Sequence, residues 1–104
     1  MKKTAYHIFF TNLANPLKID IILLLRQKER NVGELVEELK VEQSKISHAL
    51  ASLKHCNIVN VRQKGRERAY SLNKDTIVPM LNLIKKHATL HCGKKCFYCE
   101  GCGR

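Results

Sequence analysis

Four cysteines gather within eleven residues of the sequence. They are separated by three, two and two residues, at Cys92, Cys96, Cys99 and Cys102. Two cysteines that stand two residues apart can direct both sulfurs at one metal ion, and four thiolates supply the tetrahedral set that zinc prefers. Lys94 and Lys95 lie among them and favour the thiolate form. The spacing predicts metal or redox chemistry, with Zn²⁺ as the favoured cofactor.

Other chemistry remains open for the same cysteines. Three consecutive short spacings strain a single tetrahedron, so His91 or His87 could replace one thiol, or two subunits could share the ligands. Close Cys-x2-Cys runs also suit an iron–sulfur cluster. Reversible disulfides between lysine-flanked thiols are a third alternative, and no cofactor would then be needed. Cys56 stands apart from this cluster and is expected to be a small buried hydrophobe.

Length and charge narrow the class of protein. The chain has 104 residues, enough for one core, and its 19 lysines and arginines against 9 acidic residues give a net charge of +10. This balance favours nucleic acid as the partner, and an anionic membrane surface second. No apolar run approaches the roughly 20 residues of a membrane span, and no signal peptide is recognisable. We expect a soluble cytoplasmic protein, in which clustered thiols indicate a metal site more than a disulfide framework.

The stretch from Gln43 to Leu53 is predicted to be an amphipathic helix. Its apolar residues recur at i, i+3, i+4 and i+7, namely Ile46, Ala49, Leu50 and Leu53. The opposite face carries small or hydrogen-bonding side chains instead of the usual exposed Glu and Lys pairs, at Gln43, Ser44, Ser47, His48 and Ala51. Side chains of this kind fit a DNA major groove, although an ordinary amphipathic helix would share the apolar spacing.

Three further helices are predicted before this stretch. Residues 6–13 are apolar, and Asn15-Pro16 then suits the start of a second helix, whose stripe over residues 17–25 should be the centre of the core. Asn31 and Glu34 fit a capping box at the start of a third helix that ends near Lys40. Only Val41-Glu42 then precedes the Gln43 helix, so the pair is predicted to be a helix-turn-helix.

A basic β-hairpin should follow, because the apolar period changes to two after residue 57. The strands reverse near Gly65. One acid, Glu67, is outnumbered on the hairpin by Arg62, Lys64, Arg66 and Arg68. We predict that these four cations contact DNA phosphates, with a solvated charged hairpin as the alternative.

The last predicted helix is capped by Asp75 or Thr76, with Pro79 in its first turn. It is apolar on two sides, along residues 77–88 and 80–87, so it needs two partners. One can be the protein's own core and the other a second subunit, together with the apolar residues 6–13. We therefore predict a homodimer, whose two-fold symmetry would suit two DNA half-sites.

The order of these elements resembles the ArsR/SmtB family of winged-helix repressors over residues 9–90. The family usually reads Leu-Ala-Asp-Pro-Thr-Arg where residues 13–18 read Leu-Ala-Asn-Pro-Leu-Lys, and Gln-Ser-Thr-Val-Ser-His-His-Leu where residues 43–50 read Gln-Ser-Lys-Ile-Ser-His-Ala-Leu. Gly65 and Tyr70 also match. The resemblance implies a dimeric winged helix-turn-helix that reads an operator through the helix from Gln43, with the hairpin as the wing. The DNA-binding residues are then Gln43, Ser44, Lys45, Ser47 and His48 of that helix, with the four wing cations.

The sequence departs from the family at its metal sites. Members that sense arsenic, cadmium or lead carry Cys-Val-Cys where residues 31–33 read Asn-Val-Gly, and zinc sensors carry Asp-x-His where Lys74 and Thr76 stand. Only His87 and His91 remain of the zinc site.

These observations lead to one overall prediction. Residues 1–90 form a mainly α winged helix-turn-helix that binds double-stranded DNA and dimerises through its first and last helices, and residues 91–104 form a cysteine-rich metal-binding or redox segment. The protein is a transcriptional regulator, with repression favoured, and responds to a thiophilic metal or to redox state. In the alternative, DNA binding is constitutive and the segment is a structural zinc knuckle that binds another protein. An enzyme is not expected, since no catalytic constellation can be assembled.

Overall fold

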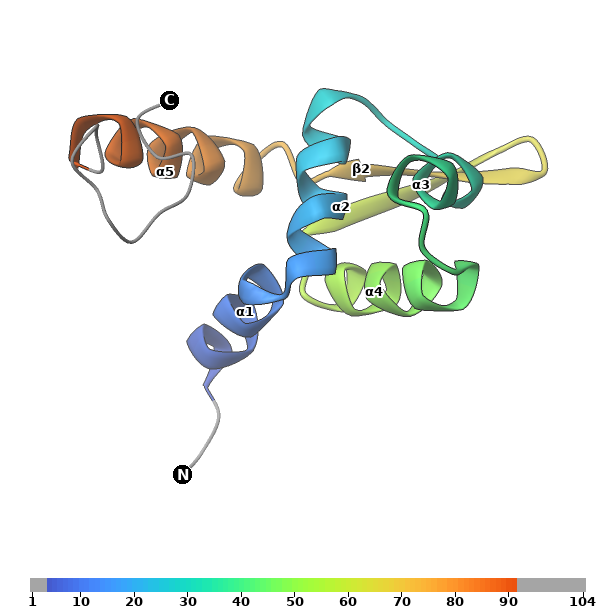
Figure 1. The fold of residues 1–104 in the computed structure, drawn as a ribbon, viewed down its shortest axis with the longest axis horizontal. Coiled ribbons are helices and arrows are strands. Elements are labelled where there is room, and N and C mark those ends of the chain that lie inside the picture. The colour runs from blue at the N-terminus through green and yellow to red at the C-terminus, as the bar shows by residue number, and fades with distance from the viewer. Residues whose placement is uncertain (1–3, 92–104) are drawn as a thin grey trace. The chain divides into compact units, whose positions relative to one another are not determined.

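The computed structural model describes residues 4–91. These residues form two compact units, the first ending at residue 73 and the second beginning at residue 74. The first unit contains four helices and a hairpin: α1 (Ala5–Ala14), α2 (Pro16–Gln27), α3 (Val32–Leu39), α4 (Gln43–His55), β1 (Val59–Lys64) and β2 (Glu67–Leu72) (Figure 1). The second unit contains α5 (Ile77–His91). This order confirms the predicted winged helix-turn-helix.

The predicted helix starts are confirmed at atomic detail. Asn15 accepts a hydrogen bond from the Lys18 backbone N–H at 3.1 Å, and Pro16 occupies the first helical position of α2. At α3, the Asn31 side chain accepts from the Glu34 N–H at 2.8 Å, while the Glu34 carboxylate accepts from the Asn31 N–H at 3.0 Å. Both bonds satisfy donors that a helix N-terminus leaves unpaired, and therefore fix where these helices begin.

The turn between α3 and α4 is short and tightly folded. Lys40 ends α3 in the left-handed conformation, with φ 55° and ψ 45°. Two residues, Val41 and Glu42, separate Lys40 from the start of α4, and Glu42 provides no side-chain cap, as the sequence indicated. The two helices and this turn form the predicted helix-turn-helix (Figure 1).

The core of the first unit is drawn from α2, α3, α4 and the residues entering β1. Its fully buried large side chains are Ile21, Ile22, Leu35, Ile46, Leu50, Leu53, Ile58 and Val59. The apolar stripe predicted for α4 is buried as expected. The stripe of α2 is narrower than expected, because Leu23 is 47 % exposed and contributes little to the core.

The hairpin pairs β1 and β2 in antiparallel register from Val59 opposite Leu72 to Lys64 opposite Glu67. The two strands are joined by Gly65 and Arg66. Gly65 has a φ of 63°, a conformation that glycine adopts without the penalty paid by other residues. The reversal near Gly65 is therefore confirmed.

In the second unit, α5 begins at Ile77, and the Thr76 carbonyl accepts the Met80 N–H at 3.1 Å. Thr76 thus holds the position before the helix, and Pro79 lies in the first turn, as predicted. Exposed apolar side chains lie along the helix, with Leu83 and Leu90 each 66 % exposed.

Within residues 4–91, no one helix has both the length and the apolar composition that a bilayer span requires. The pair α1 and α2 would reach them only across a break that bends the chain by 81°.

Candidate nucleic-acid interface

The exposed face of α4 carries the side chains expected to read DNA. Five predicted contact residues are solvent-exposed along it: Gln43, Ser44, Lys45, Ser47 and His48. On the opposite face Ile46, Ala49, Leu50 and Leu53 are buried. Burial of that stripe fixes the rotation of the helix and leaves the small polar side chains directed at solvent.

The hairpin turns one of its faces toward α4. Side chains alternate across a strand, so Val61, Arg68 and Tyr70 share a face. Together with Arg66 they line a groove of about 650 Å³ whose other wall is α4, represented by Ser47, Ala51 and Lys54. Apolar atoms of Val32, Leu50 and Val61 form part of its lining. Three exposed cations, Lys54, Arg66 and Arg68, outnumber the one acid that lines it, Glu67. Helix and wing therefore form one concave basic surface.

The other two predicted wing cations lie on the opposite face of the hairpin. Arg62 pairs across the strands with Ala69, and Lys64 with Glu67. Lys64, Glu67 and Ala69 line a separate depression of about 210 Å³ together with Glu29 and Glu34. One role was predicted for all four cations. The structure places Arg66 and Arg68 beside α4 and directs Arg62 and Lys64 to the other face of the hairpin, with Glu67 lining both hollows.

Arg62 is engaged by an acidic side chain. Its Nε and one terminal nitrogen donate to the two carboxylate oxygens of Glu29 at 2.7 and 2.8 Å. This hydrogen bonding, and then the charge of Glu29, raise the pKa of Arg62 above its ordinary value. A bidentate arginine–carboxylate pair has a defined geometry, so it holds Arg62 in one direction.

A second hollow flanks the beginning of α4 on the side of α2. It measures about 530 Å³ and is lined by Asn15, Leu17, Lys18, Ser44, Lys45, His48 and Ala49. Three of the predicted α4 residues thus lie beside the start of α2. Lys18 and Lys54, which line the two hollows flanking α4, were missed by sequence reasoning. Lys54 could have been found, because it follows Ser47 by seven residues on the same helix.

A polar network joins α1, α2 and α4 beside this hollow. The buried Asn12 side chain accepts hydrogen bonds from the Lys18 ammonium at 2.7 Å and from the Ser52 hydroxyl at 2.9 Å. Its amide nitrogen donates to the Cys56 sulfur at 2.9 Å. Cys56 is half-buried and serves as a hydrogen-bond acceptor, whereas the sequence analysis expected only a buried hydrophobe.

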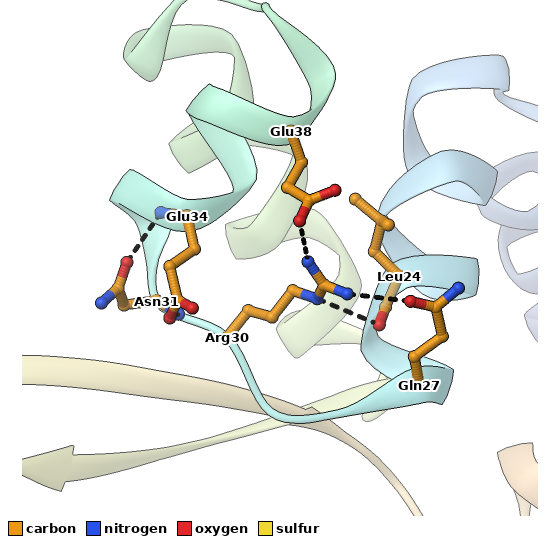
Figure 2. Close-up of polar contacts among 6 residues, drawn as sticks. All are labelled: Leu24, Gln27, Arg30, Asn31, Glu34 and Glu38. Carbon is orange, nitrogen blue, oxygen red and sulfur yellow. Dashed lines mark hydrogen bonds and ion pairs between the residues drawn. The ribbon is translucent and has the colours of Figure 1, made fainter.

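Arg30 joins the wing to the helices behind it. Its buried guanidinium donates to the Leu24 carbonyl at 3.2 Å, to Glu38 at 2.7 Å and to Gln27 at 2.9 Å (Figure 2). Its backbone exchanges two hydrogen bonds with Tyr70 of β2, at 3.0 and 2.8 Å. Arg30 could not be singled out from the sequence, because its partners are spread over α2, α3 and β2.

The metal sites of the family are not assembled in residues 4–91. The rings of His87 and His91 are 4.7 Å apart on successive turns of α5. Within the described part of the chain, however, no three histidine, cysteine or acidic side chains converge as metal ligands. The predicted ligands Cys92, Cys96, Cys99 and Cys102 lie outside the described residues.

Comparison with known proteins finds sequence similarity to bacterial transcriptional regulators. Residues 15–61 match the family described as bacterial regulatory protein, arsR family. The HTH-type transcriptional regulator Rv0081 of Mycobacterium tuberculosis is 34 % identical over 79 residues, covering 75 % of this chain and 69 % of that protein. The transcriptional repressor SdpR of Bacillus subtilis is 32 % identical over 81 residues, covering 74 % and 90 %.

Solved structures agree with these sequence matches. The crystal structure of Rv0081 superposes with a TM-score of 0.72 and 31 % identity, covering 82 % of this chain and 89 % of that one. The homodimeric winged helix-turn-helix DNA-binding domain Mb0332 of Mycobacterium bovis reaches 0.77 with 24 % identity, covering 85 % and 82 %.

Proposed function

Because the chain belongs to the ArsR family of bacterial regulatory proteins and is a DNA-binding transcriptional regulator, we propose that it represses transcription as a dimer. In this proposal α4 enters the major groove of an operator and the wing binds the neighbouring backbone. The observation that carries the proposal is the groove in which Ser47 of α4 and Arg66 and Arg68 of the wing line one concave surface.

Base reading falls to the exposed face of α4. Ser44, Ser47 and His48 can exchange hydrogen bonds with base edges, and their short side chains allow the helix axis to approach the bases. Gln43 and Lys45 lie in the first turn, where Glu42 supplies no side-chain cap for the leading backbone N–H groups. Such a helix start suits a phosphate oxygen.

Backbone binding falls to the groove beside this helix. Lys54, Arg66 and Arg68 supply positive charge on both of its walls, and its apolar lining suits the deoxyribose carbons between successive phosphates. Contacts of this type hold the register of the complex and add affinity for any sequence. They also make binding strongly dependent on salt concentration.

The proposed dimer rests on exposed apolar side chains in both units. On α1, Tyr6 is 77 % and Phe10 is 59 % exposed. Leu83 and Leu90 of α5 are exposed to a similar degree. Exposed apolar side chains that cluster on a surface commonly mark protein contacts, and the structurally similar domain Mb0332 is homodimeric. A sedimentation experiment at micromolar concentration should give twice the 12.0 kDa chain mass, and a purely monomeric species would contradict the dimer.

Titration of selected DNA duplexes tests the DNA-binding part of the proposal. An operator selected from random duplexes is titrated against the protein and the Ser47→Ala and Arg66→Ala variants. Ser47→Ala should reduce discrimination between operator and random DNA, with about 1–3 kcal/mol lost if one base contact is removed. Arg66→Ala should weaken binding to both duplexes alike. Equal discrimination in the Ser47→Ala variant and the parent would contradict base reading by this face.

We also propose that residues 91–104 bind a thiophilic metal and that this binding changes DNA affinity. The support is the four closely spaced cysteines and the absence of the family's own ligand sets from positions 31–33, 74 and 76. Zn²⁺ held by Cys92, Cys96, Cys99 and Cys102, with His91 or His87 as a replacement ligand, would supply charge neutralisation and a local crosslink.

Anaerobic purification followed by metal analysis and a visible spectrum separates the alternatives for this segment. Stoichiometric zinc in a colourless protein supports the zinc site, whereas absorption from sulfur-to-iron charge transfer would identify an iron–sulfur cluster. Operator titration with and without a chelator then tests sensing. Zinc binding with unchanged DNA affinity would leave a structural knuckle with constitutive DNA binding.

A further inference from the structure

We propose that the loop residues Glu29, Arg30 and Asn31 position the wing for DNA, and that the Glu29–Arg62 pair is a positioning pair and not a phosphate contact. This inference rests on the proposed function, because it assumes that the wing binds the DNA backbone. Glu29 and Arg30 do not line the groove beside α4, so they would set the affinity of a surface to which they do not belong, whereas Asn31 lines that groove.

Three consecutive loop residues each bind a different part of the wing. Glu29 holds Arg62 of β1 through two hydrogen bonds. Arg30 pairs with Tyr70 of β2 through its backbone. The Asn31 side chain donates to the Glu67 carboxylate, near the tip, at 2.9 Å. The hairpin is thus held at three points along its length by one short segment.

The same loop residues are fixed to the helices of the DNA-reading part. The Arg30 side chain bonds the end of α2, at the Leu24 carbonyl, and Glu38 of α3 (Figure 2). Asn31 is also the N-cap of α3. The Arg30 side chain is only 4 % exposed, and each of its three guanidinium nitrogens donates a hydrogen bond, so its direction is set by packing and by these bonds. The loop therefore connects the wing rigidly to the helix-turn-helix.

The faces of the hairpin decide the role of Arg62. Arg68 and Tyr70 line the groove with α4, and Arg62 pairs with Ala69, whose side chain faces the depression near Glu29 and Glu34. Arg62 is therefore directed away from the surface that carries Ser47. Its positive charge is opposed by a carboxylate at hydrogen-bond distance, which reduces its value for phosphate binding.

The two possible roles of Arg62 predict opposite changes in DNA affinity for Glu29→Gln. If Arg62 bound phosphate, Glu29 would compete with DNA, and Glu29→Gln would tighten binding. If the pair positions the wing, Glu29→Gln releases the hairpin and weakens binding. Glu37→Gln is the matched control, because Glu37 is an exposed acid of α3 and its loss changes the net charge equally.

The experiment measures operator affinity for Glu29→Gln, Arg62→Gln, their combination, and the reversed pair Glu29→Arg with Arg62→Glu. Relative to Glu37→Gln, we expect Glu29→Gln to weaken binding about two- to fivefold per protomer, the range that an exposed ion pair supplies. Arg62→Gln should weaken it similarly, and the combination should be no weaker than either alone. The reversed pair, which keeps the net charge, should recover affinity.

Tighter binding by Glu29→Gln than by Glu37→Gln, or no recovery in the reversed pair, would overturn the inference. Denaturant unfolding of each variant ensures that affinity is compared between folded proteins. Both residues are partly or largely exposed, at 28 % for Glu29 and 62 % for Arg62, so these variants should fold. An Arg66→Ala, Arg68→Ala double variant identifies which proposal has failed. If its operator affinity is unchanged, the wing does not bind DNA. If its affinity falls but Glu29→Gln has no effect on affinity, only the positioning role is contradicted.

Discussion

Removal of the two groove-lining wing cations should flatten the salt dependence of DNA binding. In an Arg66→Ala, Arg68→Ala double variant, two exposed side chains that share the groove with Ser47 are lost. If each neutralises one phosphate, the slope of log K against log salt becomes less negative by about 1.8 per protomer and about 3.6 in a dimer. Between 50 and 200 mM salt, the parent protein should then lose about a hundredfold more affinity than the variant.

Fluorescence anisotropy with a labelled duplex at four or more salt concentrations gives these slopes directly. The control is Lys28→Ala with Lys64→Ala, which removes the same two charges from positions that do not line the groove. If both double variants flatten the slope equally, the effect is one of net charge. The assignment of Arg66 and Arg68 to the backbone would then be refuted.

Three further substitutions test the scaffold of this surface by denaturant unfolding. Asn12→Ala leaves the Lys18 ammonium and Ser52 hydroxyl without their shared acceptor and should cost about 1–3 kcal/mol; a loss under 0.5 kcal/mol would mean that water replaces the amide. Asn31→Ala removes the α3 cap and should cost about 1 kcal/mol, whereas Asn31→Ser keeps a capping oxygen without placing a negative charge beside Glu67 and should keep most of that stability. Gly65→Ala forces alanine to a φ of 63° and should cost about 1 kcal/mol, with Gly65→Asn less harmful; an equal loss in both would contradict a purely backbone origin.

Local sequence signals were sufficient for the elements of the fold. Asn15-Pro16 and the Asn31–Glu34 box act within one turn of helix, so their geometry depends on few other residues. The change of apolar period after residue 57 likewise reports which side of each element is buried. The exposed face of α4 was predictable for the same reason, since the buried stripe determines it.

The sequence predicts in part which face of the hairpin each wing cation occupies. A two-residue loop at Gly65 and Arg66 places Lys64 opposite Glu67, and Arg68 must then lie on the other face. The alternation of side chains along a strand predicts which residues share a face, but it does not predict which residues of other elements lie against that face. Arg62 meets Glu29 from 33 positions away, and Asn12 meets Ser52 from 40 positions away. Such pairs depend on how the helices pack, which the spacing of residues along the chain does not encode.

The backbone bridge at Arg30 has a consequence for where the chain tolerates added length. The segment from Lys28 to Asn31 is a short polar connection between two helices, the kind of place at which homologous proteins commonly gain residues. Here, however, both the N–H and the carbonyl of Arg30 are bonded to Tyr70, so one inserted residue would shift the segment out of step with the strand. At the hairpin tip, the Gly65 carbonyl accepts a hydrogen bond from the Gln63 side chain of the same hairpin at 2.9 Å, so an added residue there breaks no backbone pairing with the loop before α3. Natural variation and engineered peptide insertions should therefore concentrate at residues 65 and 66 and avoid residues 28–31.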